Sequence, residues 1–100
     1  MTEWERMQKG LVYNDFYQDL FNKRVEAKKL FKAYNKTDDE EIDLRNKIMK
    51  QLFKNVGENV WIEPDFRCEF GKNITIGDNV YINFGCIIPL RHIMKFEKRI

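Results

Sequence analysis

Residues 74–94 read ITIGDNVYINFGCIIPLRHIM, and most of this stretch repeats a six-residue pattern. Apolar residues separated by one position recur as pairs: Ile74 with Ile76, Val80 with Ile82, and Cys86 with Ile88. Side chains two residues apart on a β-strand point to the same face. The pattern therefore predicts a series of short strands, each with one buried face.

The same pattern extends toward the N-terminus through the pairs Ile62/Pro64 and Cys68/Phe70. The pairs are followed by residue types that tolerate positive φ and can turn the chain: Asp65, Gly71, Gly77 and Asn83. A short strand and a tight turn every six residues are typical of a hexapeptide-repeat parallel β-helix, in which three repeats form one coil. A set of ordinary hairpins is the alternative.

A coil of three six-residue repeats would stack residues 18 positions apart. This spacing predicts three stacked pairs: Ile62 over Val80, Cys68 over Cys86, and Phe70 over Ile88. Stacked strands lie about 4.8 Å apart, which is within the Cα range of a disulfide. Because parallel side chains suit the disulfide dihedral poorly, we expect both cysteines to be thiols.

The repeat is expected to end at Ile88. The next pair would be His92 and Met94, after Pro89 at the turn position. Proline cannot adopt positive φ, and an inward imidazole would need a buried partner. We therefore predict an irregular, basic tail at residues 89–100.

Residues before the repeat predict helices. A short helical turn is expected around Trp4 to Met7. A long helix ending at Asn35-Lys36 follows from apolar residues at three- and four-residue steps: Leu20, Phe21, Ala27, Leu30, Phe31 and Tyr34. Thr37 and Glu40 form a capping-box pattern for another helix, which Gly57 would terminate. Its predicted apolar face is Ile42, Leu44, Ile48, Met49, Leu52 and Phe53.

The expected fold class is therefore α+β. An N-terminal helical segment (1–57) precedes the first one to two coils of a parallel, left-handed β-helix (58–88) and the irregular tail (89–100). With 100 residues, the chain has room for one domain.

Composition argues for a soluble protein of the cytoplasm. The sequence has no secretory signal pattern and no apolar run approaching the ~20 residues of a membrane span. Two cysteines without ligand spacing and a single histidine do not make a zinc site. Residues 91–100 carry a net charge of +3, which leaves nucleic-acid binding as a weaker alternative.

Two stretches carry a family resemblance. The run VGENVWIEPDFRCEFGKNITIGDNVYINFG (56–85) and the preceding MTEWERMQKGLVYNDFYQDLFNKRVEAKKLFKAYN (1–35) resemble the maltose/galactoside O-acetyltransferases of the hexapeptide-repeat superfamily. The resemblance covers residues 1 to about 88. It implies a trimeric enzyme that moves an acetyl group from acetyl-CoA to a sugar hydroxyl.

The resemblance also implies an acceptor site. The family's acceptor-site acid and arginine match Asp15 and Arg24, and its tyrosine and asparagine match Tyr81 and Asn83. Carboxylate and amide oxygens accept from sugar hydroxyls, while arginine donates. The alternative is structural: a helix cap, a solvated charge, an outward strand side chain and a turn residue.

Departures from the family pattern concern catalysis. The family has an aspartate shortly after the position of Ile88, where this chain has Arg91. Its histidine base lies in a Gly-His-Pro-type turn further on, and later coils build its acetyl-CoA groove. His92 lacks that context, so we assign no catalytic residue and expect poor acetyl-CoA binding by this chain.

Two functional hypotheses follow. The first is an acetyltransferase by descent that is truncated and inactive alone, with part of the acceptor site. The second is a small non-enzymatic interaction module, whose open strand edge is completed by self-association or by a partner chain.

Overall fold

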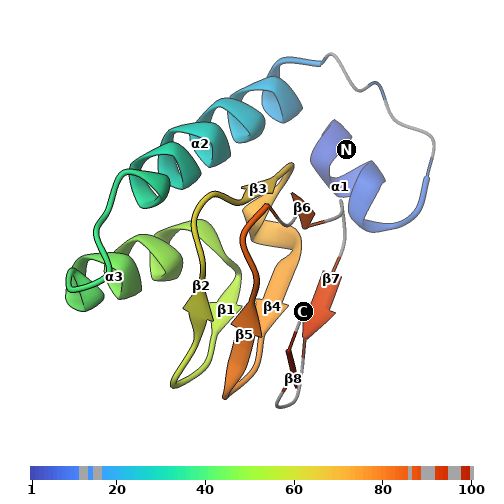
Figure 1. Ribbon diagram of the computed structural model, residues 1–100. Helices are drawn as coiled ribbons and strands as arrows, with labels where there is room; N and C mark the ends of the chain where they lie inside the picture. The colour runs from blue at the N-terminus through green and yellow to red at the C-terminus, as the bar shows by residue number, and fades with distance from the viewer. Residues whose placement is uncertain (12–13, 15–16, 86, 89–91, 95–97, 100) are drawn as a thin grey trace.

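The computed structural model describes residues 1–11, 14, 17–85, 87–88, 92–94 and 98–99. Three α-helices precede the strands along the chain: α1 (Glu3–Gln8), α2 (Gln18–Asn35) and α3 (Ile42–Leu52). In Figure 1, α2 and α3 form a helical hairpin on one side of the strands, and α1 lies near the start of α2. No helix in the described ranges is long and apolar enough to cross a membrane.

The strands are short and pair only in parallel. The described residues contain eight of them: β1 (Asn55–Val56), β2 (Trp61–Ile62), β3 (Arg67–Cys68), β4 (Ile74–Ile76), β5 (Val80–Ile82), β6 (Ile87–Ile88), β7 (His92–Met94) and β8 (Lys98–Arg99). They form three sheets, with orders β1-β4-β7, β2-β5-β8 and β3-β6. Strands β1 to β5 therefore each pair with the third strand after them, and the prediction of helices followed by short parallel strands is confirmed.

The pairing register differs from the predicted one. Ile62 lies opposite Ile82, and Cys68 lies opposite Ile88. These partners are 20 residues apart, so the predicted stacking of Ile62 over Val80 and of Cys68 over Cys86 is wrong. From β4 onward the spacing is 18, since Ile74 lies opposite His92 and Val80 opposite Lys98.

A 3-10 turn explains the change of register. The turn η1 (Gly71–Asn73) lies between β3 and β4 and lengthens that connection by two residues relative to the six-residue pattern. Paired residues on two strands that flank η1 are therefore 20 positions apart in the sequence. Paired residues on two strands that both follow η1 are 18 positions apart.

The turn chemistry also differs from the prediction. The positive-φ residues at the described corners are Asn59, Asn79 and Gly85, rather than the four that follow the apolar pairs. Asn59 and Asn79 occupy equivalent corners, and the Asn59 amide donates to Asn79 Oδ1 at 2.9 Å. Asparagine adopts the left-handed conformation more readily than other non-glycine residues.

The backbone beyond Ile88 is not wholly irregular, which corrects the predicted tail. β7 pairs with β4, and β8 pairs with β5. Pro89 and Arg91 lie outside the described residues. Parallel pairing therefore continues through two further strands after the position where we expected it to stop.

The helix predictions are confirmed for α1 and α2 and need correction for α3. Helix α3 starts at Ile42, and Thr37 does not cap it. Thr37 Oγ1 instead donates to the Tyr34 carbonyl at 2.6 Å, which closes the end of α2. Helix α3 ends at Leu52, so Gly57 does not terminate it.

The core lies between the α2–α3 hairpin and the inward faces of the strands. Its fully buried members include Tyr34, Phe53, Phe66, Ile62, Ile74, Ile76 and Ile82. Phe21, Ile42 and Leu44 were expected on apolar faces, yet each is more than two-fifths exposed. Cys68 is a buried free thiol, as expected, whereas Cys86 lies outside the described residues.

Gly71 marks the closest approach between η1 and α3. An added Cβ at this position would lie 2.2 Å from the Leu52 carbonyl oxygen and 2.6 Å from its Cδ1. The same turn is tied to α3 by a hydrogen bond from Lys72 Nζ to the Gln51 carbonyl at 2.6 Å. The turn that resets the register is therefore seated directly on the end of α3.

We expect Gly71→Ala to lower the free energy of unfolding by about 2–3 kcal/mol, because the methyl group overpacks a backbone contact. Urea unfolding followed by circular dichroism measures the loss. Gly10→Ala is the control, since Gly10 has positive φ but open space around it, and its cost should be about 1 kcal/mol from backbone strain. A larger loss at Gly10 than at Gly71 would contradict the packing explanation.

Candidate functional site

The predicted acceptor residues lie on two parts of the fold. Arg24 is on α2, Tyr81 is on β5, and Asn83 follows β5 directly. Asp15 lies outside the described residues. The contacts of these residues show how far each one departs from an ordinary surface side chain.

Arg24 is held by two neighbours that follow β3. Its Nε donates to Glu69 Oε1 at 3.2 Å, and its guanidinium lies 4.9 Å from the Phe70 ring centroid. Phe70 in turn meets the Trp4 ring edge-to-face at 5.7 Å. A carboxylate and an aromatic face together restrict a guanidinium more than either alone. Arg24 is therefore a positioned side chain and not a freely solvated helix charge.

Tyr81 is the central residue of β5, and Asn83 lies two positions further on, directly after the strand. Tyr81 is half-buried and lies opposite Trp61 of β2. Asn83 is exposed, and its Oδ1 accepts a hydrogen bond from the Phe84 backbone nitrogen at 2.9 Å. This contact supports the turn role that we considered for Asn83, while the Phe84 ring beside it is 69% exposed. The grouping of Arg24 with Tyr81 and Asn83 in one acceptor site stays a prediction.

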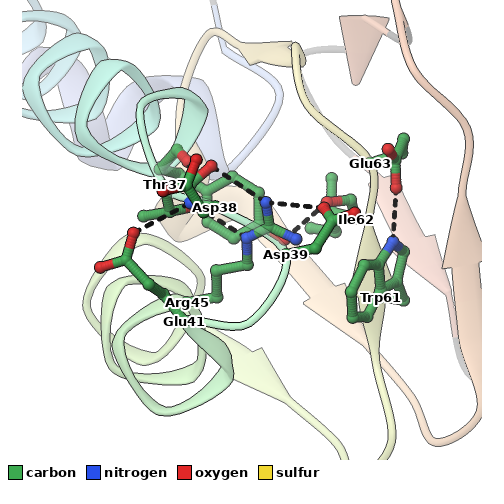
Figure 2. Close-up of polar contacts among 9 residues, drawn as sticks. Thr37, Asp38, Asp39, Glu41, Arg45, Trp61, Ile62 and Glu63 are labelled. Atoms are coloured by element: carbon green, nitrogen blue, oxygen red, sulfur yellow. Dashed lines mark hydrogen bonds and ion pairs between the residues drawn. The ribbon is translucent and has the colours of Figure 1, made fainter.

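The most constrained polar side chain in the described part of the chain is Arg45, which the sequence analysis missed. Arg45 lies on α3 and is only 3% exposed. Figure 2 shows its side chain extending from α3 to the turn that contains Thr37 and Asp39. We call the guanidinium and its neighbours Thr37, Asp39, Tyr34, Trp61 and Glu63 the Arg45 cluster.

Hydrogen bonds tie the guanidinium to the α2–α3 turn. Nε donates to Thr37 Oγ1 at 2.7 Å, and Nη2 donates to the Thr37 carbonyl at 3.1 Å and to Asp39 Oδ1 at 3.3 Å. The guanidinium also lies near two rings, 5.5 Å from the Tyr34 centroid and 5.2 Å from that of Trp61. Arg45 thus joins both helices to β2.

Two further bonds connect the cluster to β2 and its end. The Tyr34 hydroxyl donates to the Ile62 carbonyl at 2.6 Å, and Trp61 Nε1 donates to Glu63 Oε2 at 2.6 Å. Burial raises the pKa of Tyr34 to about 12, against the opposing effect of the Arg45 charge. Burial likewise raises the pKa of the Cys68 thiol to about 12, so Cys68 is a poor nucleophile at neutral pH.

A signal for Arg45 was present in the sequence. Arg45, Ile48, Met49 and Leu52 follow the i, i+3, i+4, i+7 spacing of one helix face. The three apolar members are buried together with Arg45, whereas Ile42 and Leu44 are exposed. Following the buried stripe through Arg45 would have predicted a buried guanidinium with aromatic and oxygen partners.

The described residues contain no group of three His, Cys, Asp or Glu side chains that could hold a metal ion. The acidic residues around Arg45 therefore do not form a metal centre. What they offer are hydrogen-bond acceptors beside a buried donor.

Comparison with known proteins identifies the chain's family. The family model of the maltose acetyltransferase hexapeptide capping motif matches residues 6–57, which is more than half of the chain. The chain belongs to this family. The matched segment contains all of α2 and α3, and with them Arg24 and Arg45.

Members and structures related to this family extend the match into the strands. Galactoside O-acetyltransferase of Escherichia coli is 37% identical over 88 residues, covering 88% of this chain and 43% of the relative. The crystal structure of a maltose O-acetyltransferase from Clostridium difficile 630 matches with a TM-score of 0.86 and 35% identity, covering 99% of this chain and 52% of that one.

A third comparison includes a bound ligand. A hexapeptide-repeat acetyltransferase from Vibrio cholerae, in complex with acetyl-CoA, matches with a TM-score of 0.78 and 31% identity, covering 93% of this chain and 52% of that one. The chain therefore spans about half the length of the relatives it matches. Its fold is that of the corresponding half of these acetyltransferases.

We expect Arg45→Ala to lower the free energy of unfolding by about 3 kcal/mol, because it removes a buried side chain from between two rings and leaves a cavity. Arg45→Met keeps the apolar stem and should lose less. Asp39→Asn should cost under about 1 kcal/mol, since the Asp39 side chain is 71% exposed. Urea unfolding measures all three, and equal losses for Asp39→Asn and Arg45→Ala would show that the ion pair, and not burial, dominates.

A second prediction concerns alkaline pH. Tyr34 ionises near pH 10 in the unfolded chain and near pH 12 when folded, so its contribution to stability is complete below about pH 10 and is lost as the pH rises toward 12. Tyr34→Phe should cost about 1 kcal/mol at neutral pH through the lost hydrogen bond. This cost should shrink above about pH 10.

The matched control is Tyr17→Phe, because Tyr17 is 57% exposed. Its stability should follow that of the unaltered chain at every pH. Chemical unfolding of the three proteins between neutral pH and about pH 11 tests this, and a constant Tyr34→Phe deficit across the range would exclude a raised pKa as the cause.

Proposed function

We propose that the chain is the acceptor-side half of an acetyl-CoA-dependent sugar O-acetyltransferase of the maltose/galactoside type. The observation that carries this is the match of residues 6–57 to the family model. The TM-score of 0.86 to a maltose O-acetyltransferase over 99% of the chain supports it. The assignment of a sugar as acceptor and of acetyl-CoA as donor comes from these relatives.

In this proposal Asp15, Arg24, Tyr81 and Asn83 contact the sugar acceptor. The structure supports a role for Arg24 because Glu69 and Phe70 orient its guanidinium. A fixed guanidinium can donate to a sugar hydroxyl without first losing side-chain freedom. Tyr81 and Asn83 would contribute a phenol and an amide from the end of β5.

Acetyl transfer itself needs groups that we do not assign to this chain. In the family, a histidine base in a later coil takes the proton of the attacking hydroxyl, and later coils form the donor groove. We assign no catalytic role to His92 and no residue to acetyl-CoA. Because the chain spans about half of its relatives, we propose that residues 1–100 alone bind an acceptor weakly and do not turn over.

We also propose that the strands complete a left-handed β-helix and that the protein works as a homotrimer in the cytoplasm. The repeated sheet order, in which each of β1 to β5 pairs with the third strand after it, supports the β-helix. Nothing in the part of the chain that the structure describes favours the non-enzymatic interaction module over the acetyltransferase.

The acceptor site is tested by titrating the isotope-labelled chain with maltose or a methyl galactoside and following the Asn83 side-chain amide by NMR. We expect a saturable shift. Arg24→Ala should weaken binding by about tenfold, because a hydrogen bond to a charged group is lost.

The matched control is Arg6→Ala, which removes an exposed arginine on α1. No response of Asn83 to either sugar would exclude the proposed acceptor site. A coupled assay for free coenzyme A in the presence of acetyl-CoA and sugar should show no turnover. Turnover that depends on the chain and is abolished by His92→Ala would overturn the assignment of catalysis to later coils.

A further inference from the structure

We propose that an open groove beside Arg45 binds a neutral, polyhydroxylated ligand such as a sugar ring. The groove lies between the α2–α3 turn and the end of β2, and we call it the Arg45 groove. Its lining residues are Thr37, Asp38, Asp39, Glu40, Arg45, Glu63 and Pro64. It contains none of the residues proposed for the acceptor site, so the inference goes beyond the proposed function.

The first observation is a buried donor that lacks a partner. Arg45 lines the groove and is 3% exposed. Its Nε and Nη2 are used by Thr37 and Asp39, but Nη1 is buried without a hydrogen-bond acceptor among the described residues. A buried, unsatisfied donor is costly, and a ligand oxygen that accepts from Nη1 removes the cost.

The second observation is the charge of the groove. Four acidic residues, Asp38, Asp39, Glu40 and Glu63, line the groove together with one arginine, Arg45. This excess of negative charge repels an anion, although an anion would suit Nη1. A cation would suit the carboxylates, but it cannot accept from Nη1 and is repelled by the guanidinium.

A hydroxyl group satisfies both requirements, because it accepts from Nη1 through oxygen and donates its proton to a carboxylate. Several hydroxyls on one ring could meet several carboxylates at once. The donor and acceptor types therefore select a neutral polyol over an anion, an amine or a metal ion.

The third observation is that the groove is preorganised. Trp61 Nε1 donates to Glu63 Oε2 at 2.6 Å and so orients this carboxylate. Figure 2 shows Glu63 above the Trp61 ring, with a dashed line joining its carboxylate to the indole nitrogen. The Glu63 backbone nitrogen donates to the Ile82 carbonyl at 2.8 Å, which anchors this wall of the groove to β5. A ligand would therefore meet at least one carboxylate, that of Glu63, whose position is already set.

The experiment is an NMR titration of the isotope-labelled chain with maltose, in which the two indole Nε1–H signals are followed. The chain has two tryptophans. The Trp61 indole Nε1 donates to the groove-lining Glu63 and so reports on the groove, whereas Trp4 lies on α1 against Phe70 and serves as the internal control. We expect a saturable shift of the Trp61 signal with the Trp4 signal unchanged.

Variants then assign the response to the groove. Asp39→Asn and Glu63→Gln should each weaken maltose binding at Trp61 by about tenfold. Asp43→Asn, an exposed acid in the first turn of α3, should leave it unchanged. Neither substitution removes a core side chain, and thermal unfolding of each variant verifies that it is folded.

Three results would overturn the inference. One is the absence of any Trp61 shift with maltose. Another is a Trp61 shift that Arg24→Ala or Asn83→Ala abolishes and Asp39→Asn does not, since the ligand would then sit at the acceptor site and the proposed function would survive. The third is a stronger response of Trp61 and of the 38–40 amides to the diamine putrescine than to maltose, which would indicate a cation site. A Trp61 response without any response at Asn83 would support the groove and count against the acceptor site.

Discussion

The rest of the structure depends on parallel backbone pairing between successive rows of strands. A row is three strands in chain order, such as β1 to β3 or β4 to β6. Strands of two or three residues cannot hold their own conformation, because each offers few hydrogen bonds against the entropy of ordering the chain. They persist because each row is paired to the next and because the inward residues are buried, among them Ile62, Ile74, Ile76 and Ile82. Burying one such side chain contributes about 1.5–3 kcal/mol. The α2–α3 hairpin covers the first strands and closes this core from one side.

Polar contacts fix the position of the α2–α3 hairpin on the strands. Hydrophobic packing alone would allow the helices to slide over the strands, since it is not directional. Arg45 and the Tyr34 hydroxyl remove that freedom, because their partners lie at defined atoms of the α2–α3 turn and of β2. Asn35 adds a reciprocal pair of hydrogen bonds with the backbone of Phe66. Trp61 and Glu63 are thereby placed beside the helices on the sheet that also carries Tyr81.

Periodicity predicted the parts of the fold that are set by local spacing. The six-residue pattern identified the strands around Ile74–Ile76 and Val80–Ile82, and helical spacing identified α2. The register was mispredicted because the pattern was extended evenly through Gly71–Asn73. The segments VGENVWIE (56–63) and IGDNVYIN (76–83) are similar at a spacing of 20, and comparing them would have given the observed pairing. The end at Ile88 was mispredicted because it was inferred from the restricted φ of Pro89 and from the imidazole of His92, whereas β7 pairs with β4 through the backbone.

The candidate site was less predictable for a different reason. Arg24, Tyr81 and Asn83 were found through family resemblance, and their sequence positions contain no physical signal of their own. Glu69, which accepts a hydrogen bond from Arg24, lies 45 residues further along the chain. The pattern of residues around Arg24 therefore does not reveal this contact. Arg45 did carry a local signal, but a charged residue on an apolar stripe is usually assigned to solvent.

The η1 turn has a consequence for how this kind of chain can vary. It adds two residues to one row of strands, yet Val56, Ile76 and Met94 remain aligned across three rows. The length of a row and the alignment of its strands are therefore separable properties. Because η1 is buried against the end of α3, this contact and not the ladder limits the length of the corner. Insertions here would therefore disturb the packing of α3 even where the strands stay in register.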